Sequence, residues 1–327
     1  DDFTALADRD YSDVSGEALA NVQLLEEAMV NAGFVPYSAE WWHFTDEEDY
    51  DVAEDFDPAE ALTVRTVSAI GDNILANGYG FGYAGTFDDY MDRAGGDLSY
   101  FFAGVYDVLA ADDLTIANAE NVFTTQTERV NKDHQGSDAF WFKSDPSYAE
   151  IYALGSVEAV NTANNHSHDY GEAGYEESLE ALADAGITTF GYEEVGRCQV
   201  GETTFALLGF NVLGPLEYGE DLEEMKTEVS QEIAAARTWA DVVVAYFHWG
   251  EERDTTANWD QQELAHFAAD CGADIILGSH PHVLQEVEQY NGAVIAYSLG
   301  NFVYGGAQTP ARDTMILSIR LYTDSDT

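Results

Sequence analysis

The feature that most constrains the fold is an alternation of short β-rich runs with helical stretches, which begins at Leu62. Helical periodicity predicts helices near residues 97–110, 172–185, 221–239 and 258–271. Runs rich in β-branched and aromatic residues predict seven strands, at residues 63–70, 114–117, 158–162, 204–210, 241–246, 273–277 and 293–298. Strands that alternate with helices of this length indicate an α/β domain.

Polar residues directly follow six of these seven strands. The motifs are Gly71-Asp72, Asn118-Ala119-Glu120, Ala163-Asn164-Asn165-His166, His248-Trp249-Gly250-Glu251, Gly278-Ser279-His280-Pro281-His282 and Gly300-Asn301-Phe302. Loops at the carboxyl ends of strands line the ligand crevice of α/β sheets. We therefore expect these side chains to converge on one site.

The residue types in the motifs favour a metal site. Imidazole and carboxylate groups suit zinc, manganese or iron, and an asparagine can add a carbonyl oxygen. In His280-Pro281-His282 both rings are expected on one face, because side chains of an extended segment alternate with a period of two. Five of the eight histidines fall in these loops: His166, His168, His248, His280 and His282.

Each motif also has a purely structural interpretation. Asp72 and the pair Asn164-Asn165 could be turn residues after a strand. His248 could be a semi-buried histidine, and His168 is interpreted as a bystander. The ordered set of motifs, rather than any one of them, favours a site that is, or descends from, a metal site.

In their order along the chain, the motifs resemble the CapA-type poly-γ-glutamate biosynthesis proteins, a branch of the calcineurin-like metallophosphoesterases. The resemblance covers about residues 64–320 and includes Asn-Asn-His-x-x-Asp-Tyr-Gly, His-Trp-Gly-x-Glu and Tyr-Ser-Leu-Gly-Asn-Phe. It implies an α/β fold, a calcineurin-like four-layer α/β/β/α sandwich. It also implies a metal-dependent hydrolase that acts on an anionic cell-envelope polymer or a phosphoester, near membrane-bound synthesis machinery.

The resemblance also implies roles for particular residues. His166 and Asn165 are expected to take part in catalysis, with His166 near the leaving group. The metal, one or two ions of manganese, zinc or iron, is expected to be bound by Asp72, Glu120, Asn165, His248, His280 and His282. Hydrogen-bond support for these ligands is expected from Asn118, Asp169, Glu251 and Asn301.

Two departures from the phosphoesterase pattern bear on the number of ions. Ile74 stands where the histidine of an Asp-x-His motif is usual, and Glu120 stands where a bridging aspartate is usual. We therefore predict one well-occupied ion and a weaker second position.

Residues 1–60 differ in character from the rest. Positions 15–33 have the periodicity of an amphipathic helix, and an acidic stretch that ends at Glu60 indicates a linker. The segment between them resembles the end of the D-alanyl-D-alanine dipeptidases, in which the glutamate matched by Glu40 is the catalytic base and the histidine matched by His43 binds zinc. The other ligands of that family have no match here, and catalytic zinc needs three. We expect a small helical appendage, an inactive peptidase remnant at 1–60, before a CapA-like domain at 61–327.

The charge balance limits the classes of molecule that the protein can bind. The 62 acidic and 12 basic residues give a formal net charge of −50, which disfavours binding to nucleic acid or anionic lipid. The chain has two cysteines, Cys198 and Cys271, which are too few for a disulfide-rich scaffold. Whether these two form one disulfide is an open question at this point. The envelope resemblances favour an exported, cell-surface protein whose leader lies outside this chain.

Three functions remain open from the sequence. The first is a metal-dependent hydrolase. The second is a non-catalytic assembly or export factor for a capsule polymer on a hydrolase scaffold, although a surface of charge −50 should repel poly-γ-glutamate unless cations mediate the contact. The third is part of a bifunctional cell-wall enzyme with a dipeptidase front half.

Overall fold

The computed structural model describes residues 15–32, 34–37, 44–45, 62–213, 222–304 and 311–324. The chain divides into two compact units, Asp1–Ala61 and Leu62–Thr327. In the first unit, helix α1 (Gly16–Asn31) confirms the predicted helix, and strands β1 (Val35–Pro36) and β2 (Phe44–Thr45) pair antiparallel. Glu40 and His43 lie outside the described residues.

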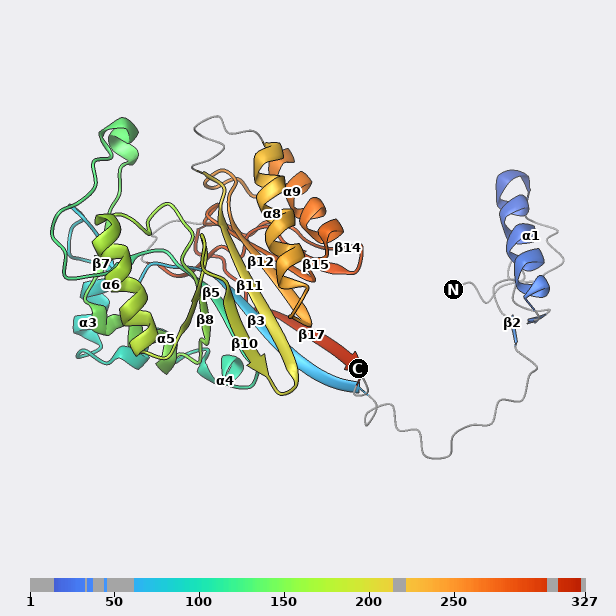
Figure 1. Ribbon diagram of the computed structural model, residues 1–327, viewed down its shortest axis with the longest axis horizontal. Helices are drawn as coiled ribbons and strands as arrows, with labels where there is room; N and C mark the ends of the chain where they lie inside the picture. The colour runs from blue at the N-terminus through green and yellow to red at the C-terminus, as the bar shows by residue number, and fades with distance from the viewer. Residues whose placement is uncertain are drawn as a thin grey trace. The chain divides into compact units, whose positions relative to one another are not determined.

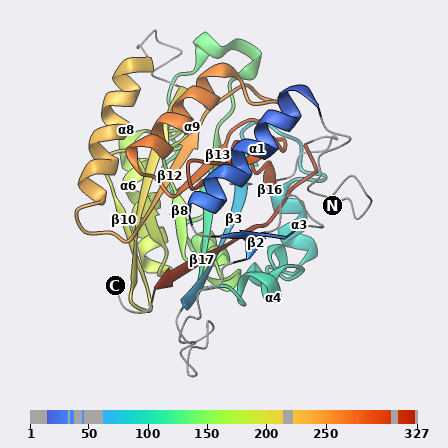
Figure 2. The same ribbon diagram turned by 90° about the vertical axis from the view of Figure 1, so that its right-hand side faces the viewer.

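The second unit contains two six-stranded sheets (Figure 1). In the first sheet the order is β10 (Gly196–Val200), β11 (Thr203–Asn211), β12 (Val242–His248), β13 (Ile275–Ser279), β15 (Ala293–Ala296) and β14 (Val287–Tyr290). The four central strands are parallel, and the two edge strands are antiparallel to their neighbours. Helices α8 (Leu222–Ala236) and α9 (Trp259–Cys271) form the crossovers between the parallel strands and lie side by side (Figure 2).

The second sheet is built around the long strand β3 (Leu62–Asn73). Its parallel path is β16 (Asn301–Val303), β3, β5 (Leu114–Ala119), β8 (Ala159–Asn161) and β9 (Thr188–Phe190), and β17 (Leu317–Asp324) pairs antiparallel with β3. A separate three-stranded sheet joins β4 (Asn77–Gly78), β7 (Phe142–Ser144) and β6 (Val122–Phe123). The helices of this half are α3 (Phe87–Arg93), α4 (Tyr106–Leu109), α5 (Glu150–Leu154), α6 (Gly171–Asp184) and the short 3-10 turns η2 (Leu98–Phe101), η3 (Asp133–Asp138) and η4 (Pro146–Ala149).

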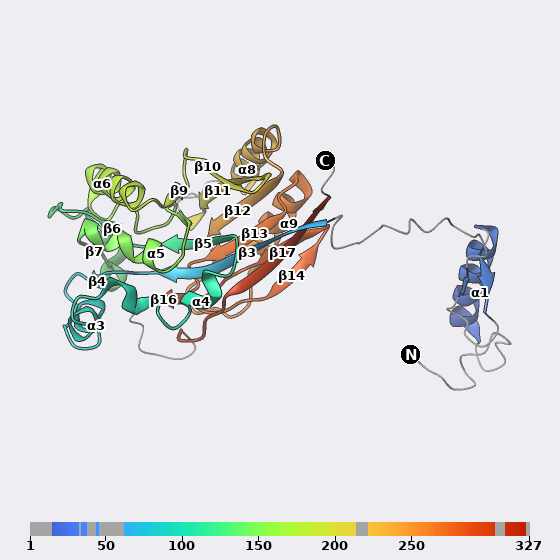
Figure 3. The same ribbon diagram turned by 90° about the horizontal axis from the view of Figure 1, so that it is seen from below.

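Three apolar clusters lie in series through this unit. The middle cluster joins the two sheets, with Val67 and Ile116 from one and Val244 from the other. A second cluster packs α8 and α9 on the outer face of the first sheet, and a third packs α3 to α6 on the outer face of the second (Figure 3). Strands buried on both faces need continuous apolar runs, which the sequence shows. The predicted α/β class is confirmed, whereas the four-layer order stays a prediction.

The structure also bears on the pairing of the two cysteines and on membrane-spanning helices. Cys198 and Cys271 are free thiols, and they pack against different apolar clusters, so they do not pair. Within the described residues, no helix combines the length and the apolar character that crossing a membrane requires.

Candidate metal centre

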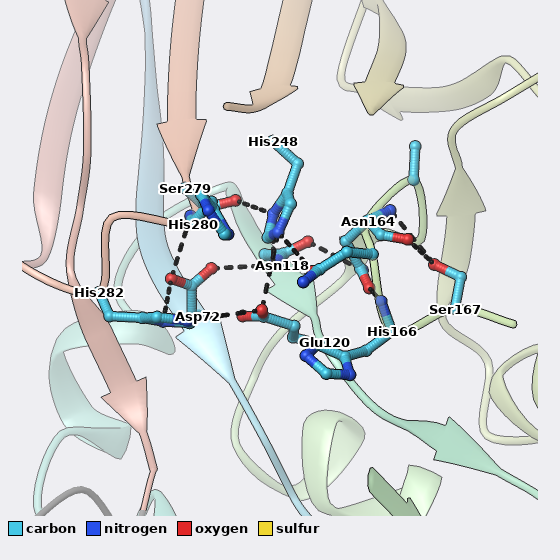
Figure 4. Close-up of polar contacts among 12 residues, drawn as sticks. Asp72, Asn118, Glu120, Asn164, His166, Ser167, His248, Ser279, His280 and His282 are labelled. Atoms are coloured by element: carbon cyan, nitrogen blue, oxygen red, sulfur yellow. Dashed lines mark hydrogen bonds and ion pairs between the residues drawn. The ribbon is translucent and has the colours of Figure 1, made fainter. Parts of the chain in front are cut away.

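Five parallel strands of the two sheets bring their carboxyl ends to one place. Strands β3 and β5 end at Asn73 and Ala119, β12 ends at His248 and β13 at Ser279. The fifth strand, β8, ends at Asn161 and leads into the turn that carries His166. Figure 4 shows that the side chains carried by these strand ends point toward one another.

Asp72 is fully buried and is held from several sides. Its backbone N–H donates to the Gly300 carbonyl at 2.9 Å, an approach that only a glycine at position 71 allows, because a Cβ there would lie 1.9 Å from that oxygen. The amide of Asn118 donates to Asp72 Oδ1 at 2.8 Å. Asp72 Oδ2 lies 3.1 Å from His282 Nδ1 and accepts the His280 backbone N–H at 3.3 Å.

Glu120, unlike Asp72, has no hydrogen-bond partner. Its carboxylate is fully buried, and neither oxygen has a hydrogen-bond partner. Its Oε1 lies 3.6 Å from His248 Nε2 and 3.7 Å from His282 Nε2, which is too far for a hydrogen bond. Glu120, His280 and His282 each offer a ligand atom, and these three atoms lie within 4.8 Å of one another.

The three histidines differ in how their nitrogens are used. His248 has both nitrogens engaged, with Nδ1 2.9 Å from the Ser279 hydroxyl and Nε2 2.9 Å from Asn165 Oδ1. His282 Nδ1 lies 3.0 Å from Asn301 Oδ1, so its Nε2 is turned to Glu120. His280 Nδ1 is buried without a partner.

The backbone of the His-Pro-His turn is strained. His280 has a φ of 94° and His282 a φ of 57°, backbone angles that residues other than glycine seldom adopt. Such conformations cost about 1–3 kcal/mol each and cluster at functional sites. The turn is therefore not the simple extended segment expected from the sequence, although it brings both rings to the same carboxylate.

The buried charges perturb one another. Burial and the nearby Asp72 carboxylate raise the pKa of Glu120 well above its usual value. Burial opposes the charge of His282 as well, yet Glu120 and Asp72 raise its pKa to about 10. Burial, reinforced by His282, lowers the pKa of His280 to about 3. Two carboxylates held this deeply therefore draw positive charge into the centre.

His166 lies beside this group in a second set of contacts. Its Nδ1 lies 2.9 Å from Asp169 Oδ2, and Asp169 also forms an ion pair with Lys132. Burial lowers the pKa of His166, although Asp169 opposes that shift. Figure 4 places the His166 ring beside Glu120, and the charge of His166 contributes to the lowered pKa of His248 and of His280.

Figure 4 shows the predicted ligands and catalytic residues that it labels close together: Asp72, Glu120, His166, His248, His280 and His282. Asn165, the remaining one, is hydrogen-bonded through Oδ1 to His248 Nε2. Three of the four predicted supporting residues make the expected kind of contact: Asn118, Asp169 and Asn301. Glu251 does not: it is exposed, and the partner of His248 Nδ1 is the Ser279 hydroxyl instead. The motif around His280 contains Ser279 and could have suggested it, whereas no sequence signal distinguishes Lys132.

The comparisons with known proteins agree with the motifs. The profile of the bacterial capsule synthesis protein PGA_cap matches residues 66–305, and the profile of the D-ala-D-ala dipeptidases matches residues 1–58. The PGA biosynthesis protein CapA of Bacillus subtilis (strain 168) is 33% identical over 238 residues, which are 67% of this chain and 60% of that protein. The capsule biosynthesis protein CapA of Bacillus anthracis is 34% identical over 179 residues, 50% of this chain and 44% of that protein.

The chain thus spans about half the length of the curated relatives that it matches. A crystal structure of a hypothetical protein from Thermus thermophilus aligns with 72% of this chain and 76% of its own at 17% identity and a TM-score of 0.42. Both family resemblances stated from the motifs are confirmed by the profiles. Since the PGA_cap profile covers well over half of the sequence, the chain belongs to the PGA_cap family of bacterial capsule synthesis proteins.

Proposed function

We propose that the second unit is a metal-dependent hydrolase of the phosphoesterase type that works in capsule synthesis at the cell envelope. The observation that carries this proposal is Glu120, whose two buried carboxylate oxygens have no partner. A buried, unpaired carboxylate is costly, and nearly all buried polar groups in proteins are satisfied. A divalent cation held by Glu120, His280 and His282 would remove that cost.

The donor set fits such an ion. Imidazole nitrogen and carboxylate oxygen suit zinc, manganese or iron. His282 donates from Nδ1 to Asn301, which fixes its tautomer and leaves Nε2 as the ligand atom. Asp72, His248 and Asn165 would hold the weaker second ion, and His248 and Asn165 are hydrogen-bonded to each other.

Different residues of the chain would have different roles in the reaction. A bound divalent cation supplies Lewis acidity and lowers the pKa of a water molecule. Asn118 fixes the Asp72 carboxylate, and Asp72 in turn orients the imidazole of His282. His166 holds a proton on Nδ1 against Asp169, so its Nε2 is free to take a proton from the attacking water and to pass it to the leaving group.

The substrate that we propose is a phosphoester or an anionic polymer of the cell envelope, handled near membrane-bound synthesis machinery. The relatives are named for capsule and PGA biosynthesis, which supports an envelope location. The net charge of −50 makes counter-ions part of any contact with an anionic polymer.

The test combines metal analysis with turnover. Protein purified without chelator should contain close to one manganese, zinc or iron per chain and should hydrolyse bis-p-nitrophenyl phosphate or p-nitrophenyl phosphate. If metal-loaded protein retains no ion and hydrolyses neither compound, the hydrolase proposal is wrong. The assembly or export factor on a hydrolase scaffold then takes its place.

For residues 1–60 we propose the remnant of a dipeptidase-like domain, which the profile match supports. Because the chain offers one zinc ligand of that family where three are needed, zinc-loaded protein should not hydrolyse D-Ala-D-Ala. Release of free D-alanine, measured with D-amino acid oxidase, would contradict this proposal and favour a bifunctional enzyme.

A further inference from the structure

Lys132 is a buried lysine in a chain with few basic residues. It lies in the chain segment that joins β6 to β7, and only 7% of its surface is exposed. Lysine is almost never buried to this degree unless its charge is paired. With 12 basic residues against 62 acidic ones, a cation placed in the interior instead of on the acidic surface calls for a specific partner.

The ammonium group has three donor hydrogens and three acceptors around it. It donates to the Phe140 carbonyl at 3.0 Å and to the Asn165 carbonyl at 3.4 Å. Its third partner is Asp169 Oδ1 in a short ion pair. Lys132 therefore contacts the chain immediately before His166 and the carboxylate three residues after it.

The other oxygen of Asp169 completes the link to the histidine. Asp169 Oδ2 accepts the Phe142 backbone N–H at 2.7 Å and lies 2.9 Å from His166 Nδ1. The Phe142 ring packs edge-on against the His166 ring at 4.7 Å between centroids. Since an ionised carboxylate only accepts hydrogen bonds, Nδ1 must carry the proton and Nε2 must be the free acceptor.

We propose that Lys132 is a positioning residue for His166: its ammonium fixes the Asp169 carboxylate in the acceptor role that sets the tautomer and orientation of the His166 ring. The inference rests on the proposed function only in assigning a proton-transfer role to His166. Without the ammonium, Asp169 Oδ1 loses its partner, and only Oδ2 still holds the carboxylate in place. The carboxylate can then turn away from Nδ1, and nothing keeps the ring in the Nδ1–H form.

The test reads the tautomer directly. Full-length protein with ¹⁵N-labelled histidine is examined at pH 8 by two-bond ¹H–¹⁵N correlation, with the His166 signals assigned by comparison with His166→Gln. Wild type should show the Nδ1–H tautomer. Lys132→Met should show Nε2–H or a mixture, and Lys132→Arg should keep the wild-type pattern. Lys143→Met, which removes a lysine from β7, should leave the pattern unchanged.

Turnover provides a second readout. With bis-p-nitrophenyl phosphate, Lys132→Met should lower kcat about 10- to 100-fold with unchanged KM and metal content, the range for groups that orient a functional side chain. If Lys132→Met does not fold, Lys132→Gln, which keeps an N–H donor without the charge, is read in the same way. A folded variant that keeps the Nδ1–H tautomer overturns the proposal. Absence of turnover in wild type defeats the proposed function instead, and the tautomer still decides the role of Lys132.

Discussion

Two of the histidine–carboxylate clusters in the described part of the second unit differ in whether the protein satisfies their hydrogen bonds. At the outer face of the first sheet, His266 Nε2 lies 2.6 Å from Glu288 Oε1, and the Tyr297 hydroxyl donates to the same oxygen at 2.7 Å. The His266 ring also stacks on Tyr290 at 3.9 Å. At the candidate metal centre, by contrast, both oxygens of Glu120 and Nδ1 of His280 are buried without partners.

The difference shows that a histidine close to a carboxylate is not by itself evidence for a metal. The pair at His266 is partly exposed, and each member already has its hydrogen bond. Glu120 is surrounded by three imidazoles and still lacks a partner. The cost of unsatisfied buried groups identifies a site that needs a ligand.

The largest effect is expected from removing both histidines of the His-Pro-His turn. His280→Ala with His282→Ala removes two of the three ligand groups, so metal content should fall at least about tenfold. His266→Ala, the matched control in the satisfied cluster, should retain the wild-type metal content. Inductively coupled plasma mass spectrometry of desalted protein makes the measurement, and equal losses in both variants would erase the distinction between the clusters.

Replacing each carboxylate by its amide should separate the clusters by stability. Burial raises the pKa of Glu120 well above its usual value, so at pH 8 this carboxyl lowers the stability of the metal-free protein. Glu120→Gln removes the ionisation and should raise the melting temperature in EDTA at pH 8. About 2–4 °C accompanies each kcal/mol in domains of 150–250 residues, so the gain should be measurable. Glu288→Gln removes a satisfied acceptor and should lower the melting temperature or leave it unchanged. Calorimetry of metal-free protein decides, and a fall for Glu120→Gln would mean that its carboxylate is already satisfied.

Salt should act on the surface carboxylates and not on Glu120. The Debye length shrinks from about 10 Å at 0.1 M salt to about 3 Å at 1 M, which weakens the mutual repulsion of the acidic surface. Melting temperature in EDTA should therefore be higher in 1 M KCl than in 0.05 M KCl, by the same amount in wild type and in Glu120→Gln. An unchanged or lower value in 1 M KCl would indicate that the surface acids are paired locally with bound cations.

The smallest effect concerns Glu232, a half-buried carboxylate on α8. Burial, with a contribution from Glu228, raises its pKa to about 7. Because the folded state binds this proton more tightly than the unfolded chain, stability falls as the pH rises from about 4.5 to 7. Glu232→Gln should therefore raise the melting temperature more at pH 8 than at pH 5, by a few degrees at most.

Glu224 is the matched control for that measurement, an exposed glutamate in the first turn of the same helix. A carboxylate at a helix N-terminus interacts favourably with the helix dipole, so Glu224→Gln should not stabilise the protein. If both substitutions raise the melting temperature equally at pH 8, the effect comes from net charge and not from the burial of Glu232.

Much of the fold was predictable because its signals are local. The predicted helix at 258–271 is α9, whose first turn is fixed by the reciprocal hydrogen bonds of Asn258 and Gln261 and whose end is set by Gly272. The predicted strand at 63–70 extends to Asn73 in β3, because β16 and β5 pair with its last residues. Strands β6 and β7 were not predicted, since two or three residues carry no readable period.

The sequence by itself determined that polar motifs lie at strand ends, because in parallel sheets those ends share an edge. Only the tertiary structure decided which atoms of the motifs are satisfied. It paired His248 with Ser279 rather than an acidic neighbour, left Glu120 without a partner, and placed Lys132 beside Asp169 across 37 positions of the chain. Hydrogen-bond satisfaction depends on distances between segments remote in sequence, and no local pattern of residues encodes those distances.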